Sequence, residues 1–165
     1  MVLDSSALIA GLDPLALGEE YEVYTTPSVL AEVALSSDRR TRLSLAVELG
    51  KAVVAKPSAE SLRAVESESA KTGDLSVLSP TDLEVLALAH QLRNGCEVVV
   101  VTDDFAIQNV AASLGLRAAS LMTLGISKRF CWELFCPGCE KALPPSYRGK
   151  RCPICGTVLR RRRRA

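Results

Sequence analysis

Residues 97–104 have the sequence Glu-Val-Val-Val-Val-Thr-Asp-Asp, and this stretch decides the fold. Glu97 to Val101 is the clearest strand signal in the chain, because consecutive valines favour extended backbone. A strand that is apolar on both faces belongs in the interior of a parallel sheet, where it is covered from both sides. Thr102, Asp103 and Asp104 follow directly, so polar side chains are expected where this strand ends.

Shorter strand and helix signals alternate with this stretch. Asp4 and Ser79 have side chains that cap helix starts, and Pro27 suits a first helical turn. Strands are expected at residues 1–3, 21–25, 52–55 and 97–101, and the strand at 52–55 is expected to be buried. Helices are expected to begin near residues 5 and 27 and to cover residues 40–49, 59–71, 80–94 and 105–114. This alternation predicts an open α/β fold with a parallel sheet flanked by helices.

Five carboxylates occupy strand ends and helix starts of this expected fold. Asp4 or Asp82 alone is explained as a helix cap. Glu32, however, lies inside an apolar helix, and Asp103 and Asp104 follow the most buried strand. Carboxylates that converge on one sheet edge repel one another unless divalent cations neutralise them. The set therefore indicates a metal site.

The ligand types narrow the metal and the chemistry. Oxygen ligands suit Mg²⁺ or Mn²⁺, and His90, the single histidine, is expected on a helix surface. One or two such metals in a carboxylate cage activate a water molecule and stabilise the charge that develops on a phosphodiester. These residues predict hydrolysis of a nucleic-acid backbone.

Four segments within residues 1–120 resemble PIN-domain nucleases. In order along the chain they are V-L-D-S-S-A-L-I, P-S-V-L-A-E-V, S-P-T-D-L-E-V-L-A-L-A and V-V-V-T-D-D-F-A-I-Q-N. The acids that match the metal-binding positions of that family are Asp4, Glu32, Asp82 and Asp104, with Asp103 as an additional candidate. The resemblance implies that Asp4, Asp82 and Asp104 hold Mn²⁺ or Mg²⁺. Ser5 and Thr102 correspond to polar positions that orient the acids or the metal-bound water.

Six cysteines lie in the chain, and four of them form the pattern C-x2-C-x12-C-x2-C. These four are Cys136, Cys139, Cys152 and Cys155. Two such pairs in a segment too small for its own core predict one structural zinc ion, with a redox pair as the alternative. Cys96 is expected to be a buried thiol at the start of a strand, and Cys131 is a substitute ligand that the two complete pairs do not need.

Charge divides the chain into unlike halves. Residues 1–127 contain 9 Lys and Arg against 17 Asp and Glu, a net charge of −8, whereas residues 128–165 contain 11 against 2, a net charge of +9. Basic side chains beside aromatic ones favour RNA, through contacts with phosphates and stacking on bases. The expected RNA-binding residues are Lys128, Arg129, Tyr147, Arg148, Lys150, Arg151, Arg160, Arg161, Arg162, Arg163 and Arg164. Trp132 and Phe135 are expected instead to pack the cysteine-rich C-terminal segment on the nuclease domain.

A PIN domain followed by a zinc ribbon and a basic end resembles one subfamily, the archaeal and eukaryotic ribosome-assembly nucleases that mature the 3′ end of small-subunit rRNA. The resemblance implies an endoribonuclease that acts on precursor rRNA within the pre-small-subunit particle. The compact length fits an archaeal version. A cytoplasmic location is expected because Asp4 interrupts the N-terminal apolar residues before a signal peptide could form. The alternatives are a toxin-type PIN ribonuclease and a non-catalytic zinc-ribbon assembly factor that binds RNA.

Domain boundaries follow from these assignments. The expected divisions are a PIN-like nuclease domain at residues 1–122, a linker at 123–130, a zinc ribbon at 131–159 and a basic tail at 160–165. Each apolar run is far shorter than the roughly 20 residues of a membrane-spanning helix, so no membrane association is expected. No residue decides the oligomeric state.

Overall fold

The computed structural model of the chain describes residues 1–33, 37–126 and 128–164. Five parallel strands form the main sheet, in the order β3-β2-β1-β4-β5. They are β1 (Val2–Leu3), β2 (Val23–Thr25), β3 (Ala52–Val54), β4 (Val99–Val101) and β5 (Arg117–Ala119). β4 pairs with β1 on one side and with β5 on the other. The valine strand is therefore an interior parallel strand, and the predicted α/β class is confirmed.

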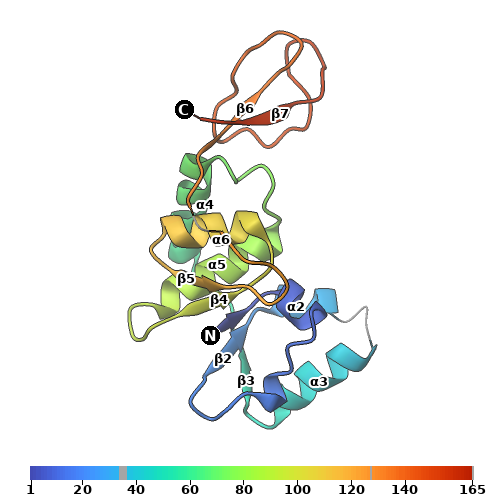
Figure 1. Cartoon of the computed structure of the whole chain (residues 1–165), viewed down its shortest axis with the longest axis vertical. Helices are drawn as coiled ribbons and strands as arrows, with labels where there is room; N and C mark the ends of the chain where they lie inside the picture. Colours follow the sequence, from blue (N-terminus) through green and yellow to red (C-terminus); the bar gives the residue numbers. More distant parts are fainter. Residues whose placement is uncertain (34–36, 127, 165) are drawn as a thin grey trace.

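Helices flank this sheet in two groups. They are α1 (Ser5–Ile9), α2 (Pro27–Val33), α3 (Ser37–Glu48), α4 (Ala59–Thr72), α5 (Pro80–Leu92) and α6 (Phe105–Ser113), with a 3-10 turn at Pro14–Ala16. α4, α5 and α6 pack on one another, and α5 also contacts β1 and β4. α3 contacts β3 and lies toward the end of the molecule that is farther from the C-terminal ribbon (Figure 1).

The core of the nuclease domain is apolar and needs no metal to close. Leu86 of α5, Val65 of α4 and Val100 of β4 are fully buried, and α5 is apolar on nearly every side. Burial of each such side chain contributes roughly 1.5–3 kcal/mol. Ser79 caps α5 through a capping box with Asp82, so the helix begins at the residue that the sequence predicts.

Several local predictions need correction. β5 was not predicted, because Arg117-Ala118-Ala119 shows no apolar alternation, and its pairing with β4 makes it a strand. Cys96 is exposed rather than buried, since β4 begins only at Val99. The strand expected to be buried at 52–55 is an edge strand with Val53 exposed. His90 is half-buried rather than a surface residue.

The C-terminal segment forms a separate two-stranded unit, the ribbon. β6 (Trp132–Phe135) pairs antiparallel with β7 (Arg160–Arg163), so Trp132 lies opposite Arg163 and Phe135 lies opposite Arg160. The residues assigned from sequence to a basic tail thus complete the ribbon's sheet. A run of identical charges has no strand periodicity, which is why the sequence did not indicate this strand. Residue 165, and residue 127 in the expected linker, lie outside the described residues.

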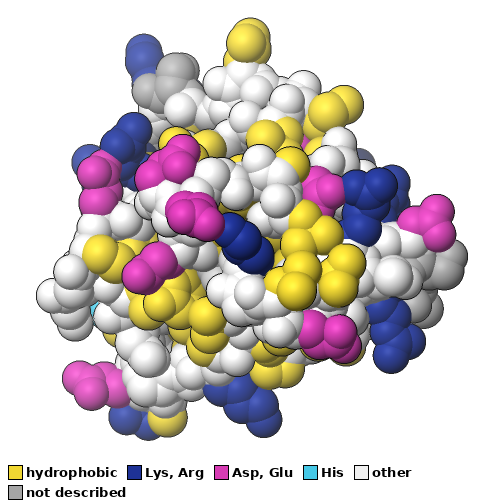
Figure 2. Space-filling view, turned by 90° about the horizontal axis from the view of Figure 1, so that it is seen from below, with side chains coloured by type: hydrophobic (Ala, Val, Ile, Leu, Met, Phe, Trp, Pro, Cys, Tyr) yellow, Lys and Arg dark blue, Asp and Glu magenta, His cyan; other side chains and the backbone are white. Residues whose placement is uncertain are grey.

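Charge is distributed differently at the two ends of the molecule. Figure 2 looks at the end opposite the ribbon and shows apolar side chains interspersed with both acidic and basic ones. The ribbon end carries the arginine strand β7 instead. Within the described part of the chain, none of the helices has the length and hydrophobicity needed to span a membrane.

Candidate metal centres

Asp4 is the most deeply buried of the predicted acids. It is 2% exposed, follows β1 and caps α1. Its Oδ1 accepts a hydrogen bond from the Ser5 backbone N–H at 2.7 Å. Its Oδ2 accepts from the Ser6 hydroxyl at 2.7 Å and from the Thr102 hydroxyl at 2.8 Å. These donors fix the carboxylate at the carboxyl edge of the sheet.

Thr102 links Asp4 to Asp104. Thr102 is fully buried after β4, and its hydroxyl accepts the Asp104 backbone N–H at 3.1 Å while donating to Asp4. Asp104 caps α6, because its Oδ1 accepts backbone N–H groups of the first turn, including that of Ile107 at 3.2 Å. Two adjacent strands thereby place two carboxylates at one edge.

Asp82 reaches the same edge from α5. Burial raises the pKa of its carboxyl group, hydrogen bonds from Ser79 act in the opposite direction, and the negative charges of Asp4 and Asp104 raise the pKa further. Asp82 lies in the first turn of α5, and α5 packs on β1 and β4, the strands that precede Asp4 and Asp104. The structure therefore brings Asp4, Asp82 and Asp104 together.

Glu32 and Asp103 are placed differently. Glu32 is exposed on α2, one turn after Ser28, whose hydroxyl donates to Glu84 of α5 at 2.5 Å. The Asp103 carboxylate faces the loop after β5, where its Oδ1 accepts the Leu121 N–H at 3.0 Å and the Met122 N–H at 2.9 Å. Hydrogen bonds from the Ser120 hydroxyl and this loop lower its pKa. Asp103 thus stabilises a loop.

The carboxylates fit a hydrated metal ion. Among the described residues, only the four ribbon cysteines form a group of three or more ligand atoms that all lie within 4.8 Å of one another. The acids are more widely spaced, which suits Mg²⁺, because that ion retains several water molecules and takes one or two carboxylates. The donor set, oxygen alone, suits Mn²⁺ equally.

Ser6 is a site residue that the sequence analysis missed. Its hydroxyl donates to Asp4 and accepts the Asp103 backbone N–H at 3.1 Å, so it ties the end of β1 to the end of β4. Ser5, which was named instead, holds Asp4 mainly through its backbone N–H, since its hydroxyl is 3.4 Å from Oδ1. The repeated serine after Asp4 was the available signal.

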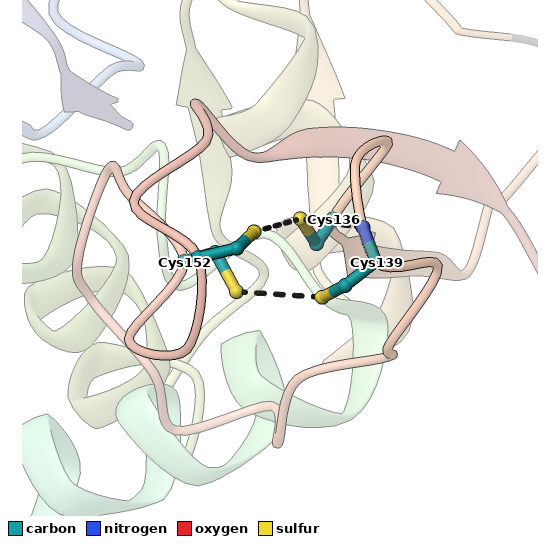
Figure 3. A group of neighbouring side chains, drawn as sticks. Cys136, Cys139 and Cys152 are labelled. Atoms are coloured by element: carbon teal, nitrogen blue, oxygen red, sulfur yellow. Dashed lines mark hydrogen bonds between the residues drawn. The ribbon is translucent and has the colours of Figure 1, made fainter.

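The four cysteines of the ribbon converge as predicted. Figure 3 shows Cys136, Cys139 and Cys152 directed toward one another from the two C-x-x-C turns. The Sγ atoms of Cys136 and Cys155 are 3.4 Å apart, and those of Cys139 and Cys152 are 3.7 Å apart. Tetrahedral Zn–S bonds of about 2.3 Å require sulfurs about 3.8 Å apart. The geometry fits one zinc ion, and Cys131 is not part of this group.

Backbone geometry shapes both cysteine turns in the same way. The Cys139 N–H donates to the Cys136 Sγ at 3.4 Å, and the Ile154 N–H donates to the Cys152 Sγ at 3.5 Å. The residue after each pair has a positive φ, 59° at Glu140 and 72° at Gly156. Such N–H···S bonds orient metal-binding thiolates, so each turn is prepared for a cation.

Hydrogen bonds within the cysteine cluster shift the pKa values of its thiols in opposite directions. Hydrogen bonds between Cys155 and Thr157 lower the pKa of the Cys155 thiol to about 6. A backbone hydrogen bond from Lys141 lowers the pKa of Cys139, but hydrogen bonds with the other thiols and burial outweigh it and raise this pKa to about 11. Zinc binds thiolates, so these thiols must lose their protons when the metal binds, and metal affinity depends on pH.

The predicted RNA-binding residues fall into two groups. Tyr147 packs on the ribbon's core, and its hydroxyl donates to the Arg151 carbonyl at 2.7 Å. Arg148 contacts the nuclease domain, 3.4 Å from the Leu75 carbonyl. Among the predicted RNA-binding residues, Arg161 is half-buried. The basic side chains of the set that are exposed are Lys128, Arg129, Arg148, Lys150, Arg151, Arg160, Arg162, Arg163 and Arg164.

Known proteins resemble this chain over its whole length. Residues 1–92 match the family model described as "PIN domain of ribonuclease". Several archaeal proteins named Endoribonuclease Nob1 are similar, and that of Pyrococcus abyssi is 42% identical over 97% of this chain and 91% of its own length. Ribonuclease VapC1 of Thermoplasma acidophilum is 38% identical over 97% of this chain and 76% of its own. The 20S-pre-rRNA D-site endonuclease NOB1 of Saccharomyces cerevisiae is 34% identical over 56% of this chain and 20% of its own.

Proposed function

Because the chain belongs to the Nob1 family of endoribonucleases, we propose that it cleaves precursor small-subunit rRNA at its 3′ end, with Asp4, Asp82 and Asp104 as ligands of Mn²⁺ or Mg²⁺. The similarity to the yeast pre-rRNA endonuclease supports this substrate. The observation that carries the metal site is the placement of Asp4 after β1, Asp104 after β4 and Asp82 in the first turn of α5, which packs on both strands. Glu32 is proposed to complete the acidic set from α2.

The catalytic metal would lower the pKa of a bound water molecule and offset the charge on the scissile phosphate. The protein's own contribution is to orient the ligands. Asp4 is held by Ser6 and Thr102, and Asp104 is held by the first turn of α6. Ligands fixed in advance lose little conformational freedom when substrate binds.

We further propose that Cys136, Cys139, Cys152 and Cys155 hold one structural zinc ion. The small apolar cluster of the ribbon, which includes Leu143 and Leu159, buries too little area to fold a segment of this size alone. The zinc would hold β6 and β7 in place, and with them the exposed basic side chains that bind RNA.

The proposed partners are precursor rRNA and the pre-small-subunit particle. The acidic nuclease domain repels RNA phosphates everywhere except at its bound metals. The binding energy must therefore come from the basic ribbon. We expect the protein where its proposed substrate is processed, in the archaeal cytoplasm.

A cleavage assay tests the proposal. A short RNA that spans the mature 3′ end is incubated with the full chain and Mn²⁺, and the product end is mapped. Asp82→Asn is expected to abolish cleavage while binding persists, whereas Glu97→Gln, which changes an acid paired with Arg117 at the amino end of β4, serves as the matched control and leaves cleavage intact. Undiminished cleavage by Asp82→Asn would exclude the assigned site.

The similarity to Ribonuclease VapC1 favours a second candidate, the toxin-type ribonuclease with a different RNA substrate. The same assay separates the candidates. A toxin-type enzyme cuts RNAs that lack the 3′ junction as readily as the precursor, and a non-catalytic binder yields no product with any metal.

A further inference from the structure

Asp74 is a buried carboxylate that the proposed reaction does not use. It follows the end of α4 and is 1% exposed. Its Oδ2 accepts a hydrogen bond from the Asn109 side chain at 2.7 Å, and its Oδ1 forms an ion pair with the Arg161 guanidinium. A buried charge is tolerated only when a partner and hydrogen bonds compensate for lost hydration. Asp74 therefore needs Arg161.

Arg161 belongs to the other half of the molecule. It lies in β7 of the ribbon, and its guanidinium also covers the Trp132 ring, 4.8 Å from the ring centroid. Its side chain is 24% exposed. A guanidinium held between a buried carboxylate and an aromatic face is withdrawn from phosphate contact.

Further contacts join the two halves at the same place. The Asn109 side chain of α6 donates to the Phe130 carbonyl at 2.8 Å and accepts the Phe130 N–H at 2.7 Å. A Cβ at Gly73 would lie 2.0 Å from the Trp132 carbonyl oxygen, so only glycine permits this approach. Figure 1 shows the ribbon beyond the end of α4, on the side of the nuclease domain where α4 and α6 lie.

Strand alternation divides the arginines of β7 between two faces. Arg161 and Arg163 share the face of Trp132, and the Arg163 guanidinium lies 4.7 Å from the centroid of Phe130. Arg160 and Arg162 lie on the other face with Phe135. Arg162 is paired with Glu133 at 2.6 Å, whereas Arg160 is exposed. The run is therefore not one uniform basic patch.

We propose that Arg161 is a positioning residue, which locks the ribbon in one orientation on the nuclease domain through Asp74. This inference rests on the proposed function and deepens it. RNA bound by the exposed arginines, Arg160 above all, then reaches the acidic site in a defined register. A flexible connection alone would let the ribbon adopt many orientations, and the local concentration of substrate at the acids would fall.

The orientation is tested without RNA. Trp132 is the only tryptophan, so its emission reports the contact with Arg161. Arg161→Gln is expected to shift this emission and to broaden the distance distribution in small-angle scattering. The matched control, Arg160→Gln, removes the same charge from the neighbouring position on the opposite face and leaves both signals unchanged. Zinc content is measured to verify that the ribbon stays folded.

The effect on the reaction is measured as a split between binding and rate. With saturating precursor RNA and Mn²⁺, Arg161→Gln is expected to lower the single-turnover rate on the order of tenfold while the Kd changes little. Arg160→Gln is expected to raise the Kd and to reduce the salt dependence of binding by about one counterion. Arg161→Lys keeps the charge and should restore part of the rate.

Asp74→Asn reaches the same lock from the nuclease side and leaves the ribbon's sequence intact. It must reproduce the Arg161→Gln result, and this keeps the proposal testable if Arg161→Gln fails to fold. The proposal is overturned if neither variant shifts the Trp132 emission. It is also overturned if Arg161→Gln reduces the salt dependence of RNA binding as much as Arg160→Gln does, or if the ribbon loses its orientation while the cleavage rate stays unchanged. If the parent chain cleaves no precursor, the proposed function fails, and the scattering result still decides the lock.

Discussion

The proposed metal sites of the nuclease domain and of the ribbon gather their ligands by opposite means. In the nuclease domain a metal-independent apolar core positions the strand ends, and hydroxyls such as that of Thr102 then hold the carboxylates. In the ribbon the thiols themselves are the centre of the fold, since Cys136 and Cys152 form half of the buried cluster. The fold of the nuclease domain therefore positions its ligands, whereas the ligands of the ribbon hold its fold together.

This difference predicts how each half responds to the loss of its metal. Without its metal, the nuclease domain is expected to lose activity and to keep its structure. Without zinc, the ribbon is expected to unfold. The predictions below test this contrast in order of decreasing expected effect.

Loss of zinc is expected to have the largest effect. Cys152→Ser removes a buried ligand, and structural zinc contributes about 10–16 kcal/mol of apparent binding free energy to small metal-dependent folds. We expect β6 and β7 to lose their order, together with zinc content and RNA affinity. The nuclease domain should keep its melting transition, because Asp74 becomes hydrated when the ribbon leaves.

Cys131→Ser is the matched control for this experiment. Cys131 is an exposed thiol beside β6 and lies outside the four-cysteine group. Its replacement should preserve zinc content and RNA binding. Nuclear magnetic resonance of both variants, with atomic absorption for zinc, measures the outcome. A nuclease domain that melts together with the ribbon in Cys152→Ser would contradict the contrast.

Neighbouring aspartates provide the next largest effect. Asp104→Asn should reduce cleavage by more than the roughly 10- to 100-fold cost of losing a residue that only orients a metal ligand. Asp103→Asn should cost less, because the Asp103 carboxylate binds the loop at 120–123 rather than the acidic group. Single-turnover rates under saturating Mn²⁺ measure both, and equal losses would return Asp103 to the metal site.

Ser6 and Ser5 test how the fold holds Asp4. Ser6→Ala removes a hydroxyl that donates to Asp4 at 2.7 Å, and we expect a roughly 10- to 100-fold loss of activity or metal affinity. Ser5→Ala retains the backbone N–H that makes the short bond to Asp4, so its effect should be much smaller. A titration of activity with Mn²⁺ distinguishes the two. The reverse order would mean that the Ser5 hydroxyl turns to the site when metal binds.

The sequence could predict the parts of the molecule that local patterns encode. The valine strand β4 and the capped helix after Ser79 carry clear strand and cap signals, and Asp104 follows β4 closely. The sheet class and the acidic edge could therefore be predicted. The cysteine spacing likewise gave the thiol cluster. β5 could not be recognised, since pairing with β4 rather than its own composition makes it a strand.

Side-chain direction was the part that the sequence could not supply. Asp103 and Asp104 are adjacent, yet one carboxylate binds a loop and the other caps α6 at the site. Arg160 and Arg161 are equally alike in sequence, and only the pairing of β7 with β6 separates their faces. The loop that Asp103 binds and the strand that pairs with β7 both lie far along the chain from these residues, and no local pattern records them.

The smallest expected effect concerns the stability of the metal-free nuclease domain. Burial and the charges of Asp4 and Asp104 raise the pKa of Asp82, so the folded state binds its proton more tightly than the unfolded state does. Ionisation of Asp82 therefore destabilises the fold as pH rises through the window above its ordinary value of 3.8. In EDTA at neutral pH, Asp82→Asn should melt a few degrees above the parent, and the gap should close as the pH falls below that window. Added Mn²⁺ should stabilise the parent more than Asp82→Asn, because ligand binding to the native state shifts the folding equilibrium. If the parent is the more stable of the two in EDTA, the acids are held together without an electrostatic cost. The repulsion expected among Asp4, Asp82 and Asp104 would then be absent.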